Sequence, residues 1–231
     1  MSTTCDITDD EREPTPALEV RTGANLHVER PTHRQGLLLV VAVLDVAAKV
    51  LLVVLLTLTV VDPSWGNLEG KAPVARALTY PLLAFALPVG WWLSGRRLST
   101  YPWFVDLLVT STCFSDILGN RLDLYDSIVW FDDWMHFMNT ALLSAAVVVL
   151  TLSPHHASLA DILQRGVAVG ITMALGWEIF EYVSFVKRSS ELPTAYADTI
   201  VDLTLGWLGS FLAALAVAVA WHWGRSRVAG R

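Results

Sequence analysis

The chain has 231 residues, of which 54% are hydrophobic and only 16% charged, and its formal net charge is −6. A charged fraction this far below the roughly 25% of soluble domains, with a mean hydropathy of +0.49, excludes an ordinary soluble domain and predicts an integral membrane protein. No basic stripe with interleaved aromatic residues is present, so no nucleic-acid partner is expected.

The N-terminal segment differs in composition from the rest of the chain. Residues 1–35 are polar and acidic and contain several prolines. Such a segment cannot bury enough apolar surface to fold alone, so we expect a disordered acidic cytoplasmic tail. It does not resemble a cleavable signal peptide, so the first apolar helix is expected to direct membrane insertion. The two cysteines, Cys5 and Cys113, form no CxxC motif and predict no structural disulfide.

Six apolar segments follow, each near the roughly 20 residues that a helix needs to cross a bilayer. They cover residues 36–61, 73–93, 102–121, 132–152, 163–186 and 197–222. The third is the most polar, because Asp106 and Asp116 lie within it. The sequence therefore predicts an all-α, six-helix transmembrane domain over residues 36–224, followed by a short basic cytoplasmic tail, 225–231.

The orientation follows from the arginines and lysines near the ends of these segments. If both termini lie on the same side of the membrane, more arginines and lysines fall in the segments on that side than in the segments on the other side. Because cytoplasmic loops carry the excess of positive residues, both termini are predicted to be cytoplasmic.

With this topology, the polar residues of four predicted helices fall at one depth, near the extracytoplasmic face. Helical spacing places several of them in pairs on one side of a helix. The pairs are Asp116/Asn120, Asp132/His136, Asp133/His136, Glu178/Glu181 and Asp198/Asp202. Rows of small residues continue from Glu178 toward Gly166 and from Asp202 toward Ala214, and such rows let membrane helices approach closely.

An ionised carboxylate in hydrocarbon costs about 3 kcal/mol on insertion scales, so clustered acids need positive charge or shared protons. Arg121, Lys187 and Arg188 lie near the rim but do not balance the acids. Carboxylate oxygens with one imidazole suit Mg, Mn, Zn or Fe, so we expect a divalent metal ion. The predicted ligands are Asp132, Asp133, His136, Glu178, Glu181, Asp198 and Asp202.

Simpler roles exist for some of these residues. Asp132, Asp133 and Asp198 begin helices, where aspartate caps amides and suits the helix dipole. Glu178 and Glu181 lie near a helix C-terminus, where the dipole disfavours anions, so they are the strongest functional signal. Asp116 and Asn120 are expected to hydrogen-bond between helices. The opposite charges of Asp45 and Lys49, four residues apart, predict a pair that neutralises itself.

Three motifs occur in order: "DDWMHF" (132–137), "WEIFEY" (177–182) and "YADTIVDLTLGWLG" (196–209). In this order they resemble the YjdF-like inner-membrane proteins of bacteria, a family of unknown function, over roughly residues 36–222. The last two motifs are also loosely similar to VanZ-like envelope proteins, although those have a glutamine and a basic residue where this chain has Glu181. The resemblance implies a multi-pass protein of the bacterial cytoplasmic membrane and no settled activity.

Three functions are compatible with these observations. The first is a metal-dependent enzyme, with Glu178, Glu181 and His136 as catalytic residues, a metal-activated water as nucleophile and a carboxylate as base. Its substrate would be a lipid or lipid-linked carrier that reaches the site from the outer leaflet. The second is a transporter or cation-binding protein, and the third is an accessory membrane protein whose acids share protons.

Overall fold

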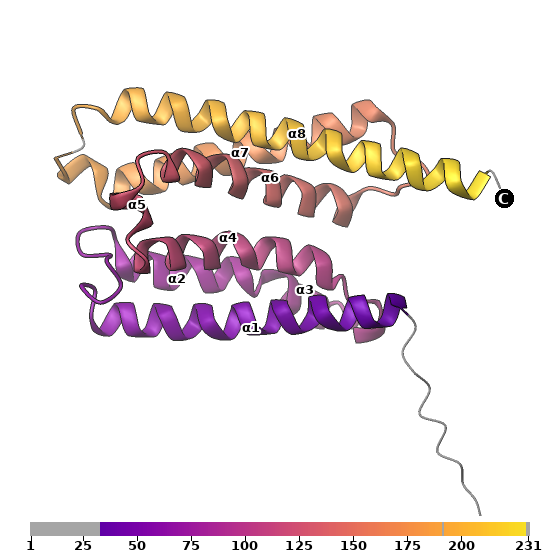
Figure 1. Cartoon of the computed structure of the whole chain (residues 1–231), viewed down its shortest axis with the longest axis horizontal. Helices are drawn as coiled ribbons and strands as arrows, with labels where there is room; N and C mark the ends of the chain where they lie inside the picture. Colours follow the sequence, from indigo (N-terminus) through magenta and orange to yellow (C-terminus); the bar gives the residue numbers. More distant parts are fainter. Residues whose placement is uncertain (1–32, 191, 230–231) are drawn as a thin grey trace, which may run out of the picture.

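The computed structural model describes residues 33–190 and 192–229, in which helices are joined by turns and loops (Figure 1). The helices are α1 (His33–Val61), α2 (Pro73–Ala84), α3 (Ala86–Leu93), α4 (Trp103–Arg121), α5 (Leu124–Ser127), α6 (Phe131–Thr151), α7 (Leu159–Ser184) and α8 (Ala195–Ala229), with short 3₁₀ turns η1 (Leu98–Thr100) and η2 (Val186–Arg188). No strand occurs in these ranges, so the all-α prediction is confirmed. Most of the predicted disordered tail, 1–35, lies outside the described residues.

Helices lie at all six predicted positions, but they are not equally apolar. Four of them are long and apolar enough to cross a membrane: Gln35–Val61, Phe131–Thr151, Leu159–Arg188 and Ala195–Gly224. A fifth span results if α2 and α3, which bend by 43° relative to each other, are taken as one. Helix α4 is not among them. The chain is therefore a membrane protein with several spans, and the count of six remains a prediction.

The bend between α2 and α3 has a local cause. Pro88 has no N–H to bond the carbonyl of Ala84, four residues earlier, and its ring crowds that carbonyl. The helix accordingly breaks at Phe85, whose backbone (φ −102°, ψ 0°) is not helical.

The helices form two groups, which we call the first half (α1–α4) and the second half (α6–α8). Figure 1 shows them as two layers, with α4 lying against α6 where the layers meet. Each half has its own apolar core: one is built around Leu52, Leu56 and Ile117, and the other around Val148, Ile162 and Ala214. Helix α1 begins, and α8 ends, at the same end of the bundle (right in Figure 1).

The second half is held together by close approach of its backbones. An added Cβ at Gly166 would lie 2.6 Å from Cβ of Ala214, and one at Gly170 would lie within 2.5 Å of Ser210 Cβ. These contacts join the small-residue rows of α7 and α8 that the sequence predicts. The rows place the polar ends of both helices side by side.

Gly209 offers the sharpest test of this packing. A Cβ there would lie 2.1 Å from the backbone carbonyl oxygen of Phe137 on α6, and a backbone atom cannot move aside cheaply. We expect Gly209→Ala to lower the free energy of unfolding by about 1–3 kcal/mol. Thermal unfolding of the detergent-purified protein measures this loss.

The matched control is Gly176→Ala on α7, where nothing lies within 4 Å of the added Cβ. Alanine favours the helix over glycine by up to about 1 kcal/mol, so this variant should unfold at the same temperature or slightly higher. Equal unfolding temperatures for the two variants would contradict the close approach of α6 and α8.

Candidate functional site

Three helices of the second half bring acids and one histidine together at the end of the bundle opposite the termini. Helix α6 supplies Asp132 and His136, α7 supplies Glu178 and Glu181, and α8 supplies Asp202. We call these five residues the acid–histidine cluster. The spacing of four between Asp132 and His136 puts both side chains on the face of α6 that meets α7 and α8.

His136 lies at the centre of the cluster, with a carboxylate on each side of its ring. Its Nδ1 is 3.4 Å from Glu178 Oε1. Its Nε2 is 3.6 Å from Asp132 Oδ1 and 3.8 Å from Asp202 Oδ1. His136, Glu178 and Asp202 are buried, whereas the side chain of Asp132 is 44% exposed at the rim.

Two buried oxygens of the cluster have no hydrogen-bond partner. They are Glu178 Oε1 and Asp202 Oδ1, the same atoms that face the imidazole. The other oxygen of Glu178 accepts a hydrogen bond of 2.9 Å from Thr199 Oγ1. Buried polar atoms are almost always bonded in native proteins, so these two oxygens mark a place where a positively charged group fits.

The side chains of the cluster form two overlapping triads that share His136. One contains Asp132 and Asp202, and the other Glu178 and Glu181. In each triad one ligand atom from every residue lies within 4.8 Å of the others. Either triad is compact enough to hold a metal ion.

Asp133 and Asp198 belong to neither triad. Asp133 is half-buried in the first turn of α6, and Asp198 is exposed in the first turn of α8. The ligand roles that the sequence suggests for them remain predictions.

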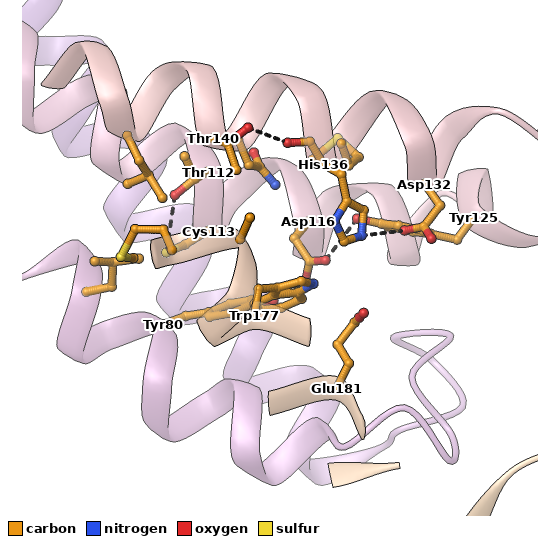
Figure 2. A pocket seen from close by; sticks show the side chains of 16 residues that line it. Tyr80, Thr112, Cys113, Asp116, Tyr125, Asp132, His136, Thr140, Trp177 and Glu181 are labelled. Atoms are coloured by element: carbon orange, nitrogen blue, oxygen red, sulfur yellow. Dashed lines mark hydrogen bonds and ion pairs between the residues drawn. The ribbon is translucent and has the colours of Figure 1, made fainter. Parts of the chain in front are cut away.

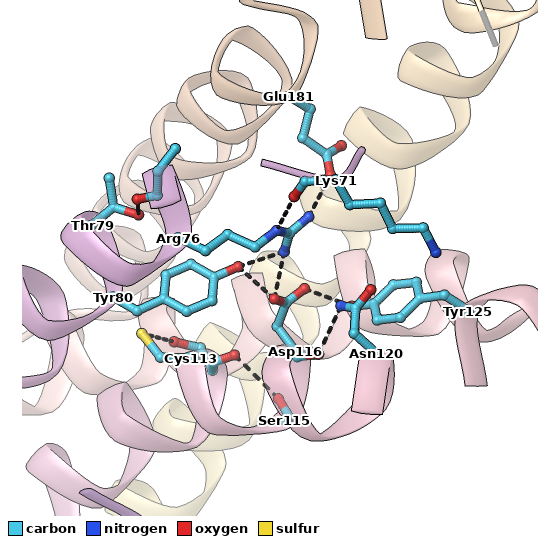
Figure 3. Close-up of polar contacts among 12 residues, drawn as sticks. Lys71, Arg76, Thr79, Tyr80, Cys113, Ser115, Asp116, Asn120, Tyr125 and Glu181 are labelled. Atoms are coloured by element: carbon cyan, nitrogen blue, oxygen red, sulfur yellow. Dashed lines mark hydrogen bonds and ion pairs between the residues drawn. The ribbon is translucent and has the colours of Figure 1, made fainter. Parts of the chain in front are cut away.

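The sequence did not identify Arg76 as a counterion, yet this buried residue of α2 lies beside the cluster (Figure 3). Its Nη1 donates to Asp116 Oδ2 at 2.5 Å and to Tyr80 OH at 2.7 Å. Its Nη2 lies 3.8 Å from Glu181 Oε1. The sequence does contain a signal that could have identified Arg76: an isolated arginine within an apolar segment, four residues before a tyrosine.

Asp116 accepts hydrogen bonds from side chains of α2 and α5. Besides Arg76, its partners are the hydroxyls of Tyr80, at 2.6 Å, and Tyr125, at 2.9 Å. The prediction that Asp116 bonds between helices is confirmed. Asn120 instead donates to the backbone carbonyl of Asp116, on its own helix.

A second polar group lies inside the first half and is largely paired within itself. Lys49 Nζ contacts Asp45 at 2.6 Å, as the sequence predicts, and also Asp106 at 2.9 Å. It donates to Thr110 as well, at 2.5 Å. This lysine joins α1 to α4.

A cavity of about 100 Å³ lies between the two halves, next to the cluster (Figure 2). That volume holds several waters, because a cavity needs only about 10–15 Å³ of water-accessible space to hold one. Its charged lining is Asp116, Asp132, His136 and Glu181, and its apolar lining includes Leu83, Met135, Leu143 and Met173. Figure 2 shows Asp132 and Glu181 toward one end and Thr112 and Cys113 toward the other.

The donor set suits a hard or borderline divalent cation, since it combines carboxylate oxygens with one imidazole nitrogen. The separations of 3.4–3.8 Å around His136 are too long for good hydrogen bonds. They are close to the distance between neighbouring ligands in a tetrahedral zinc site, about 3.3 Å from bond lengths near 2 Å.

Comparisons with known proteins agree with the membrane character of the chain. A family model described as "Predicted membrane protein (DUF2238)" matches residues 44–223, a stretch that contains every residue of the cluster and Arg76. Searches of curated proteins and of solved structures each found no match.

Proposed function

The chain belongs to the DUF2238 family of predicted membrane proteins, and we propose that it binds a divalent metal ion at the acid–histidine cluster. The observation that carries the proposal is the pair of buried, unpartnered oxygens on Glu178 and Asp202. Both face the one imidazole of the site. Burying such oxygens without a partner costs about 1–3 kcal/mol each. A cation bound by Asp202 would remove that cost there, and it would fix the imidazole proton on the nitrogen that faces Glu178.

Of the two triads, we assign the ion to the one formed by Asp132, His136 and Asp202. Glu181 already faces the guanidinium of Arg76 at 3.8 Å, and this positive charge opposes a cation in the other triad. Asp132 is partly exposed, which gives an ion a route to the site.

The assignment gives Glu178 a supporting role. With Nε2 of His136 directed at the ion, Nδ1 carries the proton and faces Glu178 Oε1 at 3.4 Å. A carboxylate in this position orients the imidazole and raises its basicity as a ligand, as in many metal sites.

We extend the proposal to a metal-dependent enzyme with hydrolytic chemistry. A bound divalent ion supplies an activated water. Glu181 lines the same cavity as His136 and Asp132, so it is the carboxylate positioned to accept the proton of that water.

A transporter receives less support from the lining of the cavity. A transported ion needs polar groups along its whole path. Among the described residues, the cavity continues from the cluster past Leu83, Leu143 and Met173, and the hydroxyls of Thr112 and Thr140 that also line it donate to backbone carbonyls of their own helices.

The proposed setting is a bacterial cytoplasmic membrane, with both termini cytoplasmic and the site near the extracytoplasmic face. The distribution of arginines and lysines supports this orientation. So does the position of the N-terminal end of α1 and the C-terminal end of α8 at one end of the bundle (Figure 1). A relationship to the YjdF-like proteins is part of the same proposal.

Metal analysis of the purified protein tests the site. After incubation with Zn²⁺ or Mn²⁺ and removal of unbound ion, we expect one ion per chain in the wild type and none in Asp202→Asn, which loses a charged ligand. Glu178→Gln should still bind, with an affinity lowered about 10–100-fold, as for other residues that orient a ligand.

The matched control is Asp133→Asn, which removes a carboxylate next to Asp132 but outside both triads. It should bind as the wild type does. A wild-type protein that binds none of Mg²⁺, Mn²⁺, Zn²⁺ or Fe²⁺ would overturn the metal site in favour of acids that share protons. An Asp202→Asn variant that binds normally would overturn the assignment of the ion to this triad.

A further inference from the structure

We infer that the cavity opens sideways between α2 and α7 and receives the first few carbons of an amphiphile's chain from the bilayer, with an oxyanion headgroup held at the acid–histidine cluster and the rest of the chain left in the lipid. The placement of the headgroup rests on the proposed cation site. The sideways entrance rests on the geometry of the cavity alone.

The first observation is the way in which α2 and α7 meet. Their main chains are held apart by large side chains: the rings of Tyr80 and Trp177 stack with their centroids 6.1 Å apart. Arg76 and Glu181 face each other next to this stack. The two halves are therefore joined here by side chains, which can change rotamer, and not by close backbone packing.

The second observation is that one residue lining the cavity also lies on the outer surface of the protein. Leu83 of α2 and Met173 of α7 both line the cavity. Met173 is also 37% exposed, and it lies near the middle of α7, a helix long and apolar enough to span the membrane. The surface around it therefore faces lipid, and a molecule that enters there must come from the hydrocarbon layer.

The third observation is the separation of polarity along the cavity. Charged side chains gather at the cluster end, whereas the remainder is lined by Leu83, Leu143 and Met173 together with Thr112, Asn139 and Thr140. The hydroxyls of Thr112 and Thr140 donate to backbone carbonyls of their own helices, so this part of the cavity offers mainly apolar contacts. A fully polar ligand would lose its hydration against those apolar side chains, at a cost of a few kcal/mol for each unpaired group. A purely apolar ligand would leave the carboxylates and His136 without partners, so an amphiphile fits both ends.

The charge of the headgroup follows from the proposed cation at that end. The carboxylates of the cluster alone would repel an anion. A divalent ion held by Asp132, His136 and Asp202 would supply the positive charge that an oxyanion requires. The expected ligand is therefore a single-chain amphiphile with a phosphate or carboxylate headgroup.

Photocrosslinking with dodecyl phosphate that carries a diazirine on one of the chain carbons nearest the headgroup tests this inference. The protein is reconstituted into lipid nanodiscs, loaded with Zn²⁺, illuminated and analysed by peptide mass spectrometry. We expect crosslinks on the segments of α6 and α7 that contain Leu143 and Met173, and unlabelled dodecyl phosphate should compete for them. Photoreactive dodecanol, which has no oxyanion, should label these segments more weakly.

Blocking variants make the test specific. Met173→Trp places a large ring at the entrance and should reduce cavity labelling about tenfold, equivalent to a penalty of about 1.4 kcal/mol. Leu83→Trp blocks the same entrance from α2. Leu175→Trp is the matched control, because Leu175 is 49% exposed on the same helix and does not line the cavity. It should label as the wild type does.

Labelling confined to the outer surface, or labelling unchanged in both blocking variants, would overturn the sideways entrance. Metal content is measured on the same samples, so the two proposals can fail separately. Normal metal binding without cavity labelling rejects the amphiphile alone. Cavity labelling in a protein that binds no metal keeps the entrance and rejects the cation site.

Discussion

Replacing Lys49 with methionine is expected to destabilise the protein by about 3–5 kcal/mol, the usual cost of removing one partner from a buried ion pair. Lys49 is buried, and its ammonium lies 2.6 Å from Asp45 and 2.9 Å from Asp106. Methionine keeps the length of the side chain but leaves two buried carboxylates without a cation. Thermal unfolding in detergent measures the loss.

Lys71→Met is the matched control for this prediction. Lys71 also pairs with an aspartate, Asp126, at 2.7 Å, but the two side chains are 26% and 51% exposed. Hydrogen bonds from Lys71 lower the pKa of Asp126, and water solvates the carboxylate once the lysine is gone. We expect a change of only about 0–1 kcal/mol.

Removing the charges together should restore much of the stability. The triple variant K49M/D45N/D106N has no unpaired ion at this position, so it should unfold at a higher temperature than K49M alone. Equal unfolding temperatures for K49M and K71M would contradict the role of Lys49 as a buried counterion.

Arg76→Met is expected to lower the free energy of unfolding by a similar amount, about 3–5 kcal/mol. The substitution leaves Asp116 buried with two tyrosine hydroxyls but no cation, and it removes the positive charge that faces Glu181. Arg76→Lys should recover little, because lysine cannot reproduce the forked donors that reach Asp116, Tyr80 and the carbonyl of Lys71.

Two variants test whether the destabilisation comes from the unpaired Asp116 or from the removal of any arginine. The double variant R76M/D116N, which has no buried charge left at this position, should be more stable than R76M. Arg121→Met removes an exposed arginine that lies over Trp65 and should change the unfolding temperature little. If R76M and R121M unfold alike, Arg76 does not act as the counterion of Asp116.

The helical fold was predictable from the sequence because hydropathy and turn residues act locally. Apolar runs of the right length gave helices at the six expected positions. The break at Phe85 was not predicted, although Pro88 is visible in the sequence, because many prolines in membrane helices bend the chain without interrupting it. The partners of Asp106 and Asp116 were also out of reach, since helical periodicity does not tell which helices touch.

The cluster was predictable in part for the same reason. A spacing of four residues places Asp132 and His136 on one face of a helix whatever its neighbours are. Asp133 is one residue further along and therefore points about 100° away, which explains why it belongs to neither triad. The meeting of Glu178 and Asp202 at His136 depends on how α7 and α8 pack on α6, and the small-residue rows gave only the tendency to pack closely.

The polarity of α4 has a consequence for how the protein is made. Asp106 and Asp116 are too costly to enter a bilayer without partners, and their cations, Lys49 and Arg76, come from α1 and α2. Both donors emerge from the ribosome before α4 does. The counterions of α4 are therefore synthesised before the carboxylates that they neutralise, so α4 can pair its charges as soon as it packs against the earlier helices.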